Sequence, residues 1–303
     1  RIRQTQLSGN SIQLRLFADW QRDGDLTPPS KEIASRTLTL DSETTLLEIP
    51  FFPEQAGEVD LRAEVKVLPG EITTDNNRSV RRVQITDDFI RLLYVAHEPT
   101  WEWRFVKEVF HRDPAVGLRG FRTYLASSDP RVRESNPLFL PTLSQRPRDF
   151  FTNDIIFLDD MPHSSLTPRF CQMVEQFVRD FGGGLVVIAG PRFGPQALGG
   201  TSLEKMLPVI IDSDAGLQDT GSFSLQLTSR AAEYPFMRLD EDPALNLQAW
   251  ENLAQVPWYR PVAHHHEQAI VLAQHPSDTC RDGKTLQPLI AVRRYGAGEV
   301  VYL

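Results

Sequence analysis

The side chains that could carry chemistry gather behind three apolar runs in the second part of the chain. The runs Ile90–Ala96, Asp154–Leu158 and Leu185–Ala189 are each apolar enough to form strands buried on both faces. Ligands of open α/β sheets bind at the carboxyl edge of parallel strands, so we expect the following residues to rim one crevice. The candidates are His97, Glu98, Trp101, Glu102, Arg104, Asp159, Asp160, Gly190 and Arg192.

Several kinds of chemistry are open to such a crevice. Asp159 and Asp160, together with histidines, are the residue types of a hydrolase, with or without a metal ion. Trp101 and Trp103 are suited to stacking against a carbohydrate or another small ligand. The alternative is that either tryptophan docks its helix or a domain interface, while the neighbouring charges pair locally.

Histidine and cysteine are the other chemistry-bearing types. His264, His265 and His266 stand in a row, and the sequence leaves open whether they bind a metal or form a solvated loop, because a zinc site needs ligands from separate elements. The two cysteines, Cys171 and Cys280, match no zinc or redox spacing, and whether they pair is also open. Gly182–Gly184 precedes its strand, unlike a phosphate-binding loop, so we expect no cofactor.

The elements that position these residues read as an α/β domain. A helix is predicted from about Pro99 to His111, and Thr167 with Pro168 opens a second helix whose apolar face ends at Gly182. Buried strands alternating with helices predict parallel pairing with right-handed crossovers. Further segments predict a helix over Leu245–Leu253 and strands over Phe223–Leu227, Ala269–Ala273, Pro288–Arg293 and Glu299–Leu303, the last two joined by a hairpin at Tyr295–Gly298.

The first part of the chain reads as a β-sandwich. Short alternating runs separated by turn residues predict strands over Ser11–Phe17, Arg36–Leu40, Thr44–Ile49, Glu58–Val67 and Arg78–Ile85. Five such strands without a helix favour an antiparallel sandwich. We therefore predict two domains, residues 1–87 and 88–303, joined by the short Thr86–Asp88 segment that restricts their relative motion.

Composition limits the partners. The formal net charge of −8 disfavours a nucleic-acid surface, which needs a basic face. No run of about eighteen apolar residues exists, so we expect membrane contact only through segments outside this sequence. The chain starts at Arg1 rather than Met and stops within the run Val300–Leu303, so we expect it to be a piece of a longer protein.

Both parts resemble bacterial families. The order Gly57, an alternating strand, Leu68-Pro69-Gly70-Glu71 and Asp75-Asn76-Asn77 before the last strand resembles bacterial cell-adhesion-related immunoglobulin-like domains, whose members mostly act as spacers. For Asp75, Asn76 and Asn77 we expect a simple turn, with calcium binding as the alternative. The segments Leu92–Val95, Trp101–Phe105, Asp154–Leu158, Gly182–Leu185, Ile188–Pro191 and Tyr295–Gly298 resemble the class I glutamine amidotransferase-like domain of large bacterial membrane-anchored proteins. The resemblance implies a flavodoxin-like, three-layer α/β domain with a mostly parallel sheet, located outside the cytoplasm.

Active amidotransferases of this class place a nucleophilic cysteine on the turn after a central strand. Here that turn is Gly190–Gly194, which holds no Cys, Ser or Thr, and Pro191 lacks a backbone donor. His265 and Glu267 match the family's His-x-Glu signature, but a base without a nucleophile does not perform acyl transfer.

We therefore expect no catalytic residues and a non-catalytic extracytoplasmic scaffold or interaction module of a larger membrane-anchored protein. Its expected partners are other proteins or other domains of the same longer chain. The alternatives are a hydrolase and a small-ligand or carbohydrate-binding domain that uses the crevice.

Overall fold

The structure is a computed structural model, and its contacts divide the chain into two compact units, Arg1–Asp88 (unit 1) and Phe89–Leu303 (unit 2). It describes residues 2–3, 9–20, 30–40, 44–45, 47, 49–51, 53, 55–68, 71, 73–85, 88–219 and 221–303. Three sequence predictions therefore lie partly outside the described residues: the strand Thr44–Ile49, the turn Leu68–Glu71 and the junction Thr86–Asp88. No described helix combines the length and apolar character needed to cross a membrane.

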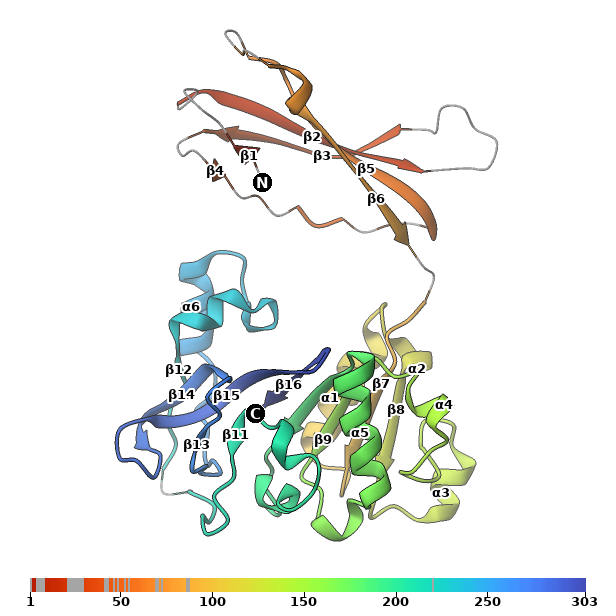
Figure 1. Ribbon diagram of the computed structural model, residues 1–303, viewed down its shortest axis with the longest axis vertical. Coiled ribbons are helices and arrows are strands. Elements are labelled where there is room, and N and C mark those ends of the chain that lie inside the picture. Colours follow the sequence, from red (N-terminus) through yellow and green to blue (C-terminus); the bar gives the residue numbers. More distant parts are fainter. Residues whose placement is uncertain are drawn as a thin grey trace. The chain divides into compact units, whose positions relative to one another are not determined.

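Unit 1 contains a four-stranded antiparallel sheet in the order β3-β2-β5-β6 (Figure 1). Its strands are β2 (Ser11–Trp20), β3 (Ser30–Thr39), β5 (Gly57–Val65) and β6 (Arg78–Ile85), and β1 (Ile2–Arg3) pairs separately with β4 (Thr44–Thr45). The predicted strands at Ser11, Glu58 and Arg78 are thus confirmed, whereas β3 begins six residues before the predicted Arg36. Asp75–Asn77 forms a short 3-10 turn, η1, directly before β6.

Unit 2 is built on one mixed sheet of eight strands in the order β12-β14-β15-β16-β10-β9-β7-β8. The four pairings from β16 to β8 are parallel and the three from β12 to β16 are antiparallel. The strands are β7 (Leu92–Ala96), β8 (Phe121–Leu125), β9 (Ile155–Asp159), β10 (Gly184–Ile188), β12 (Gln226–Leu227), β14 (Ile270–Thr279), β15 (Leu286–Tyr295) and β16 (Gly298–Tyr302). A separate pair joins β11 (Val209–Ile210) to β13 (His264–His265).

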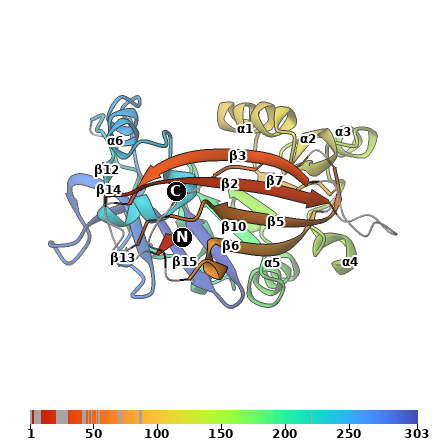
Figure 2. The ribbon, with the colours of Figure 1, turned by 90° about the horizontal axis from the view of Figure 1, so that it is seen from above.

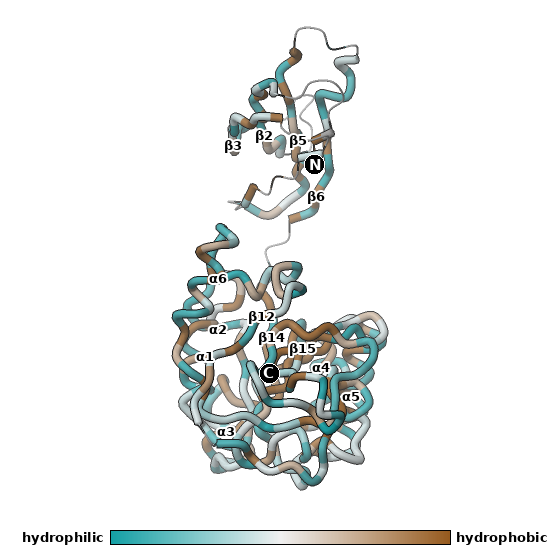
Figure 3. The backbone as a smooth tube through the Cα atoms, turned by 90° about the vertical axis from the view of Figure 1, so that its left-hand side faces the viewer, coloured by the Kyte–Doolittle hydropathy of each residue, from teal (hydrophilic) through white to brown (hydrophobic). Residues whose placement is uncertain are grey.

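Helices cover both faces of the parallel half of this sheet (Figure 2). The longer ones are α1 (Trp101–Arg112) and α5 (Pro168–Phe181), and α2 (Gly117–Gly120), α3 (Pro130–Ser135), α4 (Pro147–Phe150) and α6 (Pro243–Glu251) are shorter. Alternate residues of β7 point to opposite faces of the sheet. Leu92 and Tyr94 pack with Trp103 of α1, whereas Leu93 and Val95 pack in the core that contains the buried side chains of α5. This alternation explains why β7 is buried at every position. Figure 3 shows hydrophobic, brown stretches of backbone in unit 2, among them near the label of β15.

Local sequence explains the two long helices. The Thr100 and Thr167 hydroxyls accept hydrogen bonds from the first-turn amides of α1 and α5, and Pro168 occupies the first turn of α5. The α5 helix ends at Gly182, whose φ of 74° is the left-handed conformation that favours glycine. These ends, and the hairpin in which Tyr295 faces Gly298, agree with the sequence predictions.

The remaining predicted segments differ at their margins. The predicted strand Phe223–Leu227 is reduced to Gln226–Leu227, with Phe223 in an isolated bridge to Val256. The sequence pattern did not indicate β8, which lies at the edge of the sheet and pairs in parallel with β7.

Candidate functional site

The parallel register brings the ends of three strands together at one margin of the sheet, which we call the carboxyl edge. Asp159 is the register partner of Ala96 in β7 and of Ile188 in β10. The residues that follow, His97, Asp160 and the Gly190 turn, therefore leave the sheet side by side. Strand pairing thus assembles the predicted residues from all three segments at one place, as expected for parallel strands.

Asp160 organises the turn beyond β10. Its carboxylate accepts hydrogen bonds from the backbone N–H groups of Arg192 (3.1 Å), Phe193 (2.8 Å) and Gly194 (3.1 Å). Asp160 has a φ of 41°, an uncommon conformation for a residue with a side chain. Gly190 is required here, because a Cβ at this position would lie 2.1 Å from the Asp160 Cγ. The amides that could stabilise an oxyanion are therefore occupied by a carboxylate of the protein itself.

Arg260 holds the same turn from outside. Its Nη2 donates to the Pro191 carbonyl at 2.6 Å and its Nε to the Gly190 carbonyl at 3.3 Å. The turn thus has its carbonyls bound to a guanidinium and its amides bound to a carboxylate. Nothing in the sequence indicated Arg260, because the two residues that it binds, Gly190 and Pro191, are 70 and 69 positions earlier in the chain.

Asp159 is the most perturbed acid at the carboxyl edge. Its side chain is buried, and the Tyr94 hydroxyl donates to its Oδ2 at 2.8 Å. Burial raises the pKa of Asp159 to about 6, the hydrogen bond from Tyr94 opposes that rise, and the charges of Asp160 and Glu102 add to it. Burial also raises the pKa of Tyr94. This pair can hold a proton near neutral pH, but no nucleophile lies on the adjoining turn.

The remaining polar residues of the carboxyl edge pair with one another. The Arg192 Nη1 lies 2.6 Å from the Glu98 Oε1, and the His97 Nε2 is 4.0 Å from the same oxygen. The His97 ring meets Phe193 edge-on, with ring centroids 5.3 Å apart. The His97 Nδ1 is buried without a hydrogen-bond partner among the described residues. These contacts close the Gly190 turn onto the segment after β7.

The predicted residues of α1 face solvent, and of these Glu102 acts on the group through its charge, which raises the pKa of Asp159. Trp101, Glu102 and Arg104 are all exposed, and the Arg104 guanidinium stacks 5.0 Å from the Trp101 ring. Trp103, by contrast, is buried, and its indole N–H donates to the Thr123 Oγ1 at 2.9 Å. The two tryptophans therefore do not form a paired stacking platform, because one faces solvent and the other the core.

The histidine row is engaged elsewhere. His264 lies 3.2 Å from the Thr285 hydroxyl and 3.5 Å from the Asp282 carboxylate, and His265 is in β13, paired with β11. Burial, followed by the charge of His264, lowers the pKa of His265. Across the described ranges, no hydrogen bond, ion pair or ring contact joins these histidines to the carboxyl edge, and no three His, Cys, Asp or Glu side chains gather closely enough to hold a metal.

Both cysteines are free thiols in buried positions. Cys171 is on the buried face of α5 and packs in the core, and burial raises its pKa. Cys280 lies directly after β14, and burial raises its pKa to about 11. Neither thiol has the lowered pKa and exposure of a nucleophilic cysteine.

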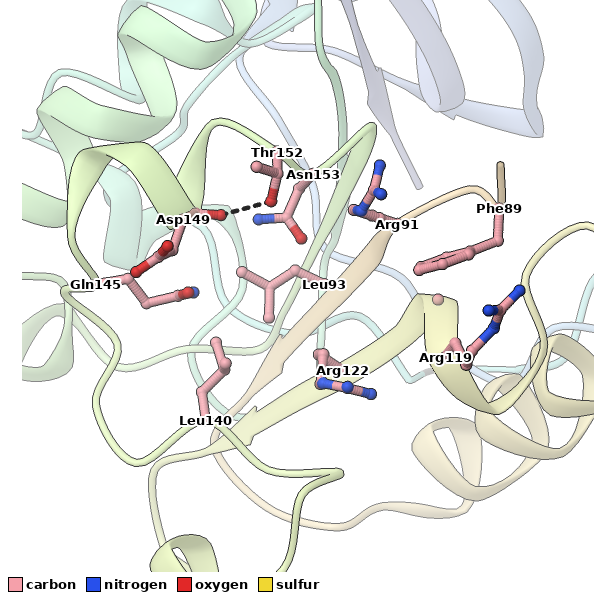
Figure 4. Close-up of a pocket in the computed structure, with 11 residues that line it drawn as sticks. Phe89, Arg91, Leu93, Arg119, Arg122, Leu140, Gln145, Asp149, Thr152 and Asn153 are labelled. Carbon is pink, nitrogen blue, oxygen red and sulfur yellow. Dashed lines mark hydrogen bonds between the residues drawn. The ribbon is translucent and has the colours of Figure 1, made fainter. Parts of the chain in front are cut away.

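A second polar region, which the sequence did not indicate, lies at the opposite margin of the sheet. We call it the amino edge, where β7, β8 and β9 begin. A pocket there has a volume of about 260 Å³ and is lined in part by Arg91, Arg119 and Arg122 (Figure 4). Arg119 and Arg122 are close in sequence at the start of β8, and the pairing of β7 with β8 brings Arg91 into the same pocket lining.

Comparison with known proteins adds no relative to this geometry. No family model matches the chain, and no curated protein matches it.

Proposed function

We propose that this chain is a non-catalytic interaction module in which the amidotransferase-like unit 2 binds a protein partner or another domain of a longer chain. The observation that carries the proposal is the Asp160 carboxylate, which fills the amide cradle of the Gly190 turn. An oxyanion at those amides would have to displace a charged acceptor with three hydrogen bonds. The lack of Cys, Ser or Thr on the turn supports the same reading.

The outer face of α1 is the surface we propose for docking. Trp101, Phe105 and Val109 follow each other at four-residue spacing and are 68%, 66% and 63% exposed. The opposite face of the same helix supplies Trp103, which is buried, and Val106 and Phe110, which pack against the core. A helix that is apolar on two opposite faces normally has both of them covered.

Charge suggests which partner fits. Arg104, Lys107 and Arg112 lie on α1, where Glu108 already pairs with Lys107 (2.9 Å) and Arg112 (3.6 Å). Leu118 of α2, which is 70% exposed, adds a fourth apolar side chain from a helix in contact with α1. The surface therefore suits a mainly apolar segment with an acidic side chain opposite Arg104, which stacks on Trp101.

Fold and location belong to the same proposal. The mixed sheet with helices on both faces supports a flavodoxin-like, class I amidotransferase-like unit 2, and the antiparallel sheet of unit 1 supports an immunoglobulin-like spacer. By that resemblance the module belongs to the extracytoplasmic part of a membrane-anchored protein, with attachment through other segments.

Site-specific photo-crosslinking tests the docking surface. A photoreactive residue at Phe105 in the full chain, expressed in its native host, should give one adduct of defined mass, and Trp101→Glu should abolish that adduct. Leu247 of α6, which is 50% exposed, is the matched control position and should give none. Equal crosslinking at both positions would refute the surface.

A turnover assay tests the absence of catalysis. Hydrolysis of glutamine and of simple amides and esters by the chain should equal that of the Asp159→Asn variant. Turnover above this level in the parent chain would favour the hydrolase alternative instead.

A further inference from the structure

The pocket at the amino edge is separate from the carboxyl edge. Arg91 directly precedes β7, Gly120 precedes β8 and Asn153 lies two residues before β9, and all three line the pocket. Because the strands are five residues long, the two edges are roughly 17 Å apart. A function at this pocket is therefore independent of the Gly190 turn.

The walls of the pocket differ in chemistry. Arg91, Arg119 and Arg122 form one side, while Gln145 and Asn153 stand on the other (Figure 4). Leu93 and Leu140 lie between the two sides, where Leu140 is partly exposed and Leu93 is fully buried. Asp149 is the only carboxylate among the lining residues, so the lining carries a positive charge in a chain whose formal net charge is −8.

Arg119 and Arg122 are positioned by contacts that leave their charge in place. The Arg91 and Arg119 guanidinium carbons lie 4.7 and 4.8 Å from the Phe89 ring centroid. The Arg122 Nη1 donates to the carbonyls of Phe121 (3.0 Å) and Leu118 (3.3 Å). Within the described part of the chain, neither Arg119 nor Arg122 forms a salt bridge. Aromatic and carbonyl contacts orient guanidinium groups without neutralising them.

Gly120 keeps this arrangement close to the sheet. A Cβ at Gly120 would lie 2.2 Å from the Ile90 carbonyl oxygen, so a larger residue would push α2 away from the start of β7. Gly120 lies between Arg119 and Arg122 in the chain, so its close approach fixes the backbone from which both arginines extend into the pocket lining. The cluster thus depends on a backbone contact that only glycine permits.

We propose that this pocket binds a small organic anion whose carboxylate or phosphate group faces the arginines and whose short apolar body rests on Leu140. Arginine matches both oxyanions with paired N–H donors, and the pocket has a volume of about 260 Å³. Gln145 and Asn153 offer hydrogen bonds to the far end of the ligand.

Titration calorimetry of the full chain with three probes tests this site. The probes are phenyl phosphate, phenylacetate and inorganic phosphate, and we expect saturable binding of at least one phenyl compound, tighter than that of inorganic phosphate. The better phenyl compound identifies the oxyanion as phosphate or carboxylate. Arg119→Met and Arg122→Met should each weaken this binding about tenfold or more, because a charge-assisted bidentate contact is lost.

Arg131→Met is the matched control, since Arg131 is an exposed arginine on α3 that does not line the pocket. Arg119 is itself exposed, so its replacement leaves the core intact, and thermal unfolding of each variant verifies folding. The proposal is overturned if no probe binds saturably up to about 10 mM, the range of weak fragment binding. It is equally overturned if Arg131→Met weakens binding as much as the pocket variants do, or if inorganic phosphate binds as tightly as the phenyl compounds.

Discussion

Individual carboxylates decide the chemistry of the carboxyl edge. Asp159 and Asp160 are neighbours in sequence, yet Asp159 is buried beside the Tyr94 hydroxyl and Asp160 binds three backbone amides of the next turn. A carboxylate with one hydrogen bond and little water favours its protonated form. The pair therefore divides into a proton-holding residue and a structural clamp.

The raised pKa of Asp159 predicts a specific pH dependence. The folded-state pKa is about 6 against 3.8 for the ordinary group, so between these values folding takes up a proton and the free energy of unfolding falls as pH rises. Asp159→Asn, which cannot ionise and still accepts from Tyr94, should gain about 2 kcal/mol of stability relative to the parent between pH 4.5 and 7.5. Urea unfolding at the two pH values measures this.

Asp219→Asn controls for the loss of one negative charge, since Asp219 is exposed. A stability difference between Asp159→Asn and the parent that stays constant across the two pH values would contradict the buried, protonated state of Asp159.

Among the elements, α5 shows how a helix end is specified by two glycines with different roles. Gly182 has a φ of 74°, and a Cβ there would meet its nearest neighbour at 3.5 Å, so its role is conformational. Gly183 has no such φ, but a Cβ there would lie 2.0 Å from the Phe177 ring. The first glycine ends the helix and the second lets the chain pass beneath an aromatic ring of the core.

These roles predict different costs for alanine. Gly182→Ala should lower the free energy of unfolding by about 1 kcal/mol through backbone strain, and Gly183→Ala by about 3 kcal/mol through overpacking. Gly216→Ala, where a Cβ would meet nothing within 4 Å, is the control and should change stability little. Urea unfolding of the three variants compares them, and Phe177→Leu should partly rescue Gly183→Ala. Equal costs for Gly182 and Gly183 would rule out the steric role.

At the scale of the whole molecule, the reactivity of the two thiols measures how readily two regions of unit 2 open to solvent. Cys171 is in the core of the parallel half, and Cys280 follows β14 in the antiparallel half. Both are buried, and burial raises the pKa of each, so little thiolate is available to a reagent in the folded state.

We expect both thiols to react with a disulfide reagent only as the protein opens. The native chain should show slow reaction of both groups at pH 8 and rapid reaction in denaturant, with Cys171→Ser and Cys280→Ser assigning the two phases. Fast stoichiometric labelling of either thiol in the native state would mean that its region is open, and a disulfide-linked form under mild oxidation would mean that the two sites can meet.

The sequence by itself determined the local features. Buried apolar runs predicted β7, β9 and β10, the cap residues Thr167 and Gly182 bounded α5, and the turn Gly190–Gly194 was already seen to lack a nucleophile. These follow from side-chain period, backbone preference and residue type, which are properties of neighbouring residues. The edge strand β8 was not predicted, because its five residues show only a short alternation of buried and half-buried positions. Its pairing with β7, which is distant in sequence, makes it a strand.

Only the tertiary structure decided how the candidate residues are used. The Asp160 clamp joins residues 32 to 34 positions apart, the Tyr94–Asp159 bond spans 65, and the arginine pocket needs β7 beside β8. Trp101 is exposed and Trp103 is buried, and this difference likewise depends on which face of α1 packs against the sheet. Contacts between residues distant in sequence determine which side chains are buried, and burial in turn affects their protonation and hydrogen bonding. A short stretch of neighbouring residues therefore cannot predict these properties.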